Sequence, residues 1–72
     1  MAGQVHTVPR DGGWINEGGG ETIGVAHDTK DTAIEAGRAA AREREAEHVI
    51  HNQDGTIGEK NSYGNDPRDV PG

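Results

Sequence analysis

The chain has 72 residues and no cysteine, which limits it to one domain and excludes disulfide bonds and thiol chemistry. Thirteen acidic against seven basic residues give a net charge of −6, and such a field repels nucleic acid and anionic lipid. Because no signal peptide, apolar span or lipid-attachment motif is present, we expect a cytoplasmic protein without a membrane role.

The supply of core-forming side chains is small, because the chain has neither phenylalanine nor leucine and only 29% of its residues are hydrophobic. Burying one large apolar side chain contributes about 1.5–3 kcal/mol, whereas ordering one residue costs about 1.5 kcal/mol. A solitary fold of this composition is therefore marginal. Self-association would bury additional surface, and we predict a homodimer.

The first third of the chain predicts a three-stranded antiparallel meander. β-branched residues favour strands at residues 4–9 and 22–27, and a shorter strand is expected at residues 14–16. Asp11-Gly12-Gly13 supplies the positive-φ positions that a tight reversal needs. Residues 16–20 include three consecutive glycines, and we expect them to form a flexible turn without regular structure.

The middle of the chain predicts a helix over residues 30–45, capped by Asp28 or Thr29. Asp31 lies in the first turn, where the helix dipole favours a carboxylate. The side chains of the expected buried stripe are small, so the helix must sit close to a sheet, and Gly37 marks the point of closest approach. The stripe comprises Ala33, Ile34, Gly37, Ala40 and Ala41.

The last third predicts a hairpin of residues 47–52 and 56–60 with Asp54-Gly55 as its two-residue loop. This register places Ile50 and Ile57 on one face and Val49, His51 and Lys60 on the other. The whole is an α+β fold of order β-β-β-α-β-β, with a small antiparallel sheet packed on one amphipathic helix. We expect a single domain over residues 1–66 and a flexible tail at residues 67–72.

Several short motifs follow one another in a characteristic order along most of the chain. They are Val8-Pro9, Gly13-Trp14, His27-Asp28-Thr29, the alanine-rich helix, Val49-Ile50-His51, Asp54-Gly55-Thr56-Ile57 and Asn61-Ser62-Tyr63-Gly64-Asn65-Asp66-Pro67. In this order they resemble domain-of-unknown-function family 2188. The resemblance implies a small stand-alone bacterial, archaeal or phage protein with strands and hairpins around one helix and no agreed activity. Residues 16–20 depart from the pattern, because the family more often carries lysine or arginine there, so a nucleic-acid role is not carried over.

Four histidines are the candidates for metal binding or general-base chemistry, but their spacing is not diagnostic. His48 and His51 are three apart on a predicted strand and therefore point to opposite faces. We interpret them, with His6 and His27, as polar strand residues or hydrogen-bonding residues at the core edge. The glycines at 18–20 precede a strand with no following Lys-Ser/Thr, which indicates a hairpin loop and not a phosphate site.

The acidic residues are spread over turns and the helix exterior, and Ser62 has no strand-turn-helix elbow around it. We therefore predict no enzymatic activity and assign no catalytic, cofactor-binding or metal-binding residue.

The possible interaction surface consists of residues of three kinds. The aromatic side chains are natural interface anchors, although Trp14 can instead form the core under the helix. The helix arginines lie one turn apart, and pairing with Glu35 and Glu45 favours a solvated, salt-bridged face over a nucleic-acid site. Strand residues on the face away from the helix complete the set, which comprises Trp14, Tyr63, Arg38, Arg42, Val49 and His51.

As function we predict a non-catalytic interaction or adaptor protein that acts as a homodimer and binds a protein partner or a basic ligand. The first alternative is a nucleic-acid-associated accessory protein that uses the helix arginines, with Lys30 and Arg44 nearby, and the second is a small-molecule or metal-binding module. A patch formed by Arg38, Arg42 and Arg44 would favour the first alternative, and a pocket converging on the histidines would favour the second.

Overall fold

A computed structural model describes residues 3–63 of the chain. Its first three strands form the expected antiparallel meander, β1 (Gln4–Arg10), β2 (Gly13–Gly18) and β3 (Glu21–His27). Asp11 and Gly12 both adopt positive φ, so the two residues of the β1–β2 turn have the backbone conformation that the sequence predicted for a tight reversal. The expectation of a flexible turn over residues 16–20 is wrong, because β2 continues to Gly18 and only Gly19 and Gly20 turn. The strand persists because Asn16 and Glu17 pair with residues of both neighbouring strands.

Helix α1 (Lys30–Arg44) matches the predicted range to within one residue. The Thr29 side chain caps its N-terminus by accepting a hydrogen bond from the backbone N–H of Thr32 at 3.3 Å. At the other end Glu45 adopts the left-handed conformation, and the N–H of Ala46 reaches back to the carbonyl oxygen of Ala41 at 2.8 Å. This pattern of bonds satisfies carbonyl groups that the helix end would otherwise leave unpaired.

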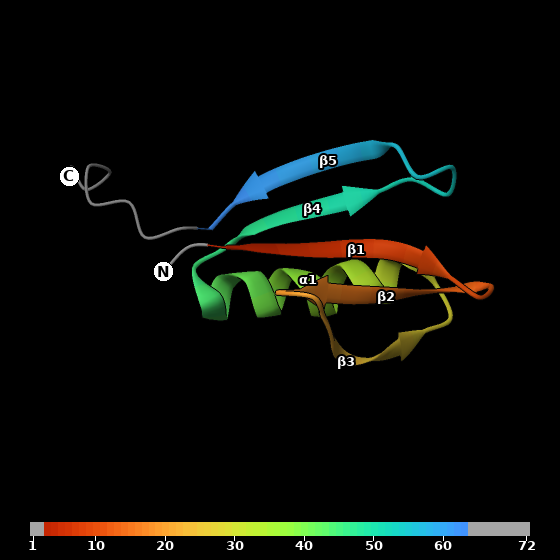
Figure 1. Ribbon diagram of the computed structural model, residues 1–72, viewed down its shortest axis with the longest axis horizontal. Coiled ribbons are helices and arrows are strands. Elements are labelled where there is room, and N and C mark those ends of the chain that lie inside the picture. Colours follow the sequence, from red (N-terminus) through yellow and green to blue (C-terminus); the bar gives the residue numbers. More distant parts are fainter. Residues whose placement is uncertain (1–2, 64–72) are drawn as a thin grey trace.

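The sheet has five strands in the order β3-β2-β1-β4-β5, with β4 (Glu47–His51) and β5 (Ile57–Ser62) added beyond β1 (Figure 1). The predicted fold class and element order are confirmed. The sheet is mixed, however, because β1 and β4 are parallel while the other three pairs are antiparallel. Helix α1 carries the chain from the edge strand β3 across the sheet to the far side of β1, and a crossover of this kind returns the chain in the same direction.

The helix packs against one face of the sheet through the small side chains that the sequence singled out. Ala33, Gly37 and Ala41 are buried, and Ile34 and Ala40 are half-buried. Around the C-terminal half of the helix, the core cluster consists of Val5, Ala41 and Ala46, with Ile23, Ala40 and Tyr63 packed against it. Short side chains on the helix let its backbone lie close to the strands, as the sequence predicted.

The loop of the last hairpin is longer than the two residues predicted. The N–H of Asn52 bonds the carbonyl oxygen of Thr56 at 2.7 Å, and the N–H of Gly55, at positive φ, bonds the carbonyl oxygen of Asn52 at 2.9 Å. The Asp54 carboxylate accepts bonds from the hydroxyl and the backbone N–H of Thr56, and these two bonds lower the pKa of Asp54. This arrangement is a three-residue loop with glycine in its left-handed position, for which Asp-Gly is equally suited.

The change of loop alters the register next to the turn, but not from Ile50 onward. Ile50 pairs with Glu59 as predicted, but Ile57 lies opposite His51 and is 57% exposed. The predicted tail at residues 67–72 and the end of the predicted domain at residue 66 lie outside the described residues. Within residues 3–63, no helix has the length and apolar character needed to cross a membrane.

Candidate functional site

One face of the sheet carries no helix (Figure 1), and side chains from several strands lie next to one another on it. In β1 the side chains of Val5 and Thr7 point towards α1, so the even-numbered residues occupy the opposite side. The same alternation and the strand register identify the members from β2, β4 and β5. We call this surface the open face, and it includes Gln4, His6, Val8, Arg10, Ile15, Glu17, Glu47, Val49, His51 and Lys60.

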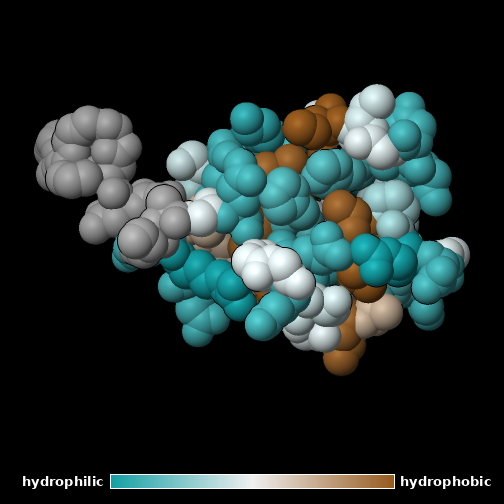
Figure 2. Space-filling model, viewed as in Figure 1, coloured by the Kyte–Doolittle hydropathy of each residue, from teal (hydrophilic) through white to brown (hydrophobic). Residues whose placement is uncertain are grey.

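The centre of the open face is apolar. Val49 is 2% exposed and Ile15 is 6% exposed, although no helix covers them. Val49 is flanked in register by His6 and Lys60, and Ile15 stands opposite the half-buried Val8. Figure 2, drawn from the same side as Figure 1, shows small hydrophobic areas separated by hydrophilic side chains. The open face therefore has an apolar interior beneath polar side chains, and not a broad hydrophobic surface.

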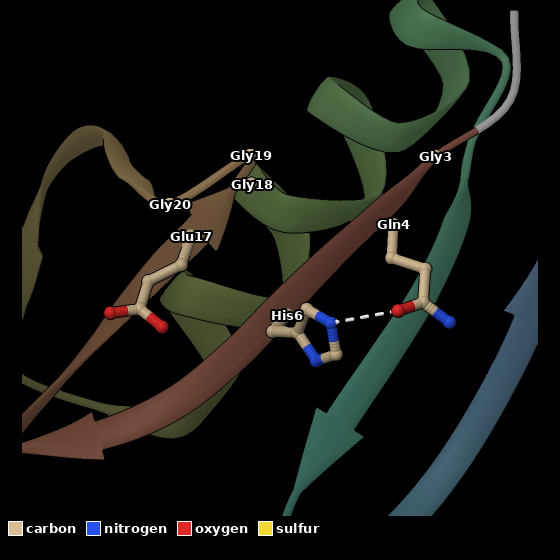
Figure 3. Close-up of a pocket in the computed structure, with 7 residues that line it drawn as sticks. All are labelled: Gly3, Gln4, His6, Glu17, Gly18, Gly19 and Gly20. Atoms are coloured by element: carbon tan, nitrogen blue, oxygen red, sulfur yellow. Dashed lines mark hydrogen bonds between the residues drawn. The ribbon is translucent and has the colours of Figure 1, made fainter.

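Two histidines from neighbouring strands meet on the open face. His6 Nδ1 of β1 lies 3.0 Å from His51 Nε2 of β4, and the two ring centres are 5.2 Å apart. On the outer side of His6, its Nε2 atom lies 3.1 Å from Gln4 Oε1 (Figure 3). The Gln4 amide nitrogen in turn donates a hydrogen bond of 2.9 Å to the Glu47 carboxylate. The parallel pairing of β1 with β4 creates this chain of contacts, which sequence spacing alone does not reveal.

Two ion pairs border the histidines. Arg10 contacts Glu17 at 2.9 Å, and Lys60 lies 3.8 Å from Glu47. Each of these side chains is at least 31% exposed, so the pairs contribute little to stability. Two positive and two negative groups thus balance on this surface, although the whole chain carries −6.

A shallow hollow of about 440 Å³ lies at the end of the open face where β1 begins and β2 ends (Figure 3). The side chains of Gln4, His6 and Glu17 line it together with glycine backbone at residues 3 and 18–20. Glu17 is the only charged side chain in this lining. The hollow therefore suits a polar or basic group and not an apolar or anionic one.

A second polar cluster is buried between the sheet and the helix. Thr7 Oγ1 donates to Asn16 Oδ1 at 2.5 Å, so the hydroxyl accepts from His48 Nε2 at 2.7 Å. Asn16 Nδ2 donates to the carbonyl oxygen of Ala33 in the helix at 3.0 Å. All of these side chains lie directly beneath Gly37, whose missing side chain leaves room for them.

Burial lowers the pKa of His48, and the positive charge of Arg38 lowers it further. A neutral ring that donates from Nε2 fits this environment. Because His48 is only 1% exposed, this cluster holds the helix on the sheet and offers no binding site to solvent.

The family model described as "Uncharacterized protein conserved in bacteria (DUF2188)" matches residues 5–63. The chain belongs to this family. The matched range covers the helix and the strands of this DUF2188 protein apart from Gln4, the first residue of β1, and it confirms the resemblance read from the sequence motifs. No curated protein and no solved structure matches the chain.

The aromatic residues that sequence analysis proposed for an interaction surface lie on the helix side of the DUF2188 fold. Trp14 is 8% exposed and lies beneath the first turn of α1, with Lys30 Nζ 5.2 Å from its ring centre. Tyr63 is half-buried against the core cluster around Val5. Of the two roles considered for Trp14, that of a core residue under the helix agrees with its position in the structure. Of the predicted surface residues, Val49 and His51 belong to the open face.

Among the helix arginines of this DUF2188 protein, Arg44 lies apart from Arg38 and Arg42. The charge of Arg38 acts on His48 in β4, whereas an Arg44 guanidinium nitrogen lies 3.2 Å from the point where a side chain on Gly18 of β2 would begin. Arg38 and Arg42 are exposed one helical turn apart, and Arg44 lies on the side of α1 that faces β2. The predicted ion pairs with Glu35 and Glu45 do not form, because both ion pairs among residues 3–63 lie on the open face.

Proposed function

We propose that this DUF2188 protein is a non-catalytic interaction module of the cytoplasm that pairs through its open face with a protein partner, in the first instance a second copy. The observation that supports the proposal is the one-sided sheet. A helix covers one face, while the other presents an apolar interior and a charge-balanced polar rim. Two like faces can meet without accumulating charge, because each offers both signs.

The dimensions of the sheet predict a weak complex. Five strands spaced about 4.8 Å apart and about 20 Å long give a face of roughly 24 by 20 Å. Stable complexes bury about 800 Å² per partner, so this face lies at or below the lower end of that range. We expect micromolar affinity, equivalent to about 8 kcal/mol, and not a permanent dimer.

Val8 is the most suitable position for testing this surface, because it is half-buried at the middle of the open face. In Val8→Glu a carboxylate would have to be buried on pairing, and we expect this variant to remain monomeric where the native chain dimerises. Val25→Glu is the matched control, because Val25 is 70% exposed on the edge strand β3. Sedimentation velocity from 1 to 200 μM measures the association of all three proteins, and circular dichroism checks that each is folded.

A native chain that sediments as a 7.6 kDa monomer at every concentration would refute the homodimer. Equal dimerisation of Val8→Glu and the native chain would place the interface elsewhere.

A further inference from the structure

The hydrogen bonds around the histidine pair determine which nitrogen of each ring carries a proton. The Gln4 amide nitrogen donates to Glu47, so Gln4 Oε1 faces His6 and can only accept. His6 Nε2 must therefore carry a proton. His51 Nδ1 lies 3.5 Å from the carbonyl oxygen of Gly55, at the outer limit of a hydrogen bond, and the tautomer with a proton on Nδ1 serves this contact.

The two inner nitrogens are thus left facing each other. When both rings are neutral and carry their protons on these outer nitrogens, His6 Nδ1 and His51 Nε2 each present a lone pair at a separation of 3.0 Å. Two lone pairs at this distance repel unless a positive species lies between them. The arrangement also matches the outer contacts of metal-binding histidines, which donate their second N–H to a carboxylate, a carbonyl oxygen or water.

From this geometry we propose that His6 and His51 form a binding site for a divalent transition metal of the zinc or copper class, with His6 Nδ1 and His51 Nε2 as its protein ligands. Two nitrogens bound tetrahedrally to Zn²⁺ at about 2.0–2.1 Å stand roughly 3.3–3.4 Å apart. The two atoms need to separate by only about 0.3–0.4 Å from their present 3.0 Å. The rings are tilted by 37° and not stacked, which leaves their nitrogens free to converge on one ion.

The rest of the coordination sphere opens away from the sheet. Among residues 3–63, no group of three or more histidine, cysteine, aspartate or glutamate side chains converges to hold a metal. The chain therefore supplies two ligands, and water completes the coordination. Imidazole nitrogen favours zinc, copper and nickel over calcium and magnesium, which prefer oxygen ligands. Gln4 positions His6 in this arrangement and does not itself bind the ion.

Isothermal titration of the full chain, without an affinity tag, with ZnCl₂ tests the proposal. His6→Gln and His51→Gln should each weaken zinc binding by at least about tenfold, and Gln4→Ala should weaken it by about tenfold through loss of the outer hydrogen bond. The control is His27→Gln, because His27 lies in β3, separated from β1 by β2, and should leave the dissociation constant unchanged. Circular dichroism verifies that every variant is folded.

Nitrogen-15 spectra of the histidine rings provide a readout that a purely structural role would not affect. Zinc should shift His6 Nδ1 and His51 Nε2 selectively, while His48 stays unchanged in its buried cluster. The proposal is overturned if 1 mM ZnCl₂ produces no binding, if the pair retains a shared proton and excludes zinc at pH 7.5, or if His27→Gln weakens binding as much as His51→Gln. A native chain that binds zinc but sediments as a monomer at every concentration would leave this site standing while refuting the proposed self-association.

Discussion

Gly37 is the position where a single methyl group should disturb the fold most clearly. A β-carbon added there would lie 2.5 Å from Asn16 Oδ1, 2.6 Å from His48 Nε2 and 2.7 Å from Thr7 Oγ1. Non-bonded heavy atoms settle at about 3.5 Å, so the polar side chains or the helix must move by up to about 1 Å. Such a movement would break at least one hydrogen bond of the buried cluster, because these bonds are only 2.5–3.0 Å long.

Gly37→Ala makes both destabilising and stabilising contributions to the free energy of unfolding. Leaving a buried polar group unpaired costs about 1–3 kcal/mol, and overpacking costs a further 1–3 kcal/mol. Alanine returns up to about 1 kcal/mol through its higher helix propensity. We therefore expect Gly37→Ala to lower the free energy of unfolding by about 1–5 kcal/mol, equivalent to a fall in Tm of roughly 5–35 °C.

Urea denaturation followed by circular dichroism measures this change. Ala39→Gly is the reference variant, because Ala39 is exposed on the same helix and reports the propensity term alone, about 1 kcal/mol. If Gly37→Ala were more stable than the native chain by about that amount, the close approach of helix and sheet at Gly37 would be refuted.

Three further predictions concern the buried cluster and the sheet edges. Because folding lowers the pKa of His48, the unfolded chain binds the proton more readily than the folded one. The free energy of unfolding should therefore be highest above pH 6.5 and fall at lower pH. Urea midpoints measured between pH 8 and 5 should fall less in His48→Gln than in the native chain. Thr7→Val removes a hydroxyl that serves two buried partners and should cost about 2–4 kcal/mol in urea denaturation, whereas Thr22→Val at an exposed position should cost less than about 0.5 kcal/mol. Val25→Thr and Ile57→Thr change exposed edge residues, so their Tm values should stay within a few degrees of the native value, and a loss of 10 °C in either would contradict the exposure seen here.

Sequence reasoning reached the local elements and the helix–sheet contact. The helix bounds and the turn at Asp11-Gly12 depend on residues near one another in the chain, and the close approach at Gly37 could be predicted from the small residues of the helix stripe itself. Alternation within a strand likewise placed His48 and His51 on opposite faces, as observed. Short-range patterns suffice for such features because the constraints are themselves short-range.

The arrangement of the strands in the sheet was harder to predict. A hairpin pattern identifies the neighbour that follows a strand, but it does not tell which strand receives the chain after a helix. The pairing of β1 with β4 therefore went unrecognised, and the contact between His6 and His51 with it. The loop length at Asp54-Gly55 was predicted wrongly for another reason, because the same dipeptide fits both a two-residue and a three-residue loop. At residues 16–20 the glycines concealed a strand that Asn16 anchors through its buried side chain.

The central position of β1 also sets how the chain can fold. In the register of β1 with β4, Gln4 lies opposite Glu47, a separation of 47 − 4 = 43 residues. During synthesis the second edge of β1 stays unpaired until β4 has left the ribosome. Contacts so distant in sequence also slow folding. A fragment that ends before β4 would expose the middle of the sheet as an unpaired edge, so the element made first is among the last to be completed.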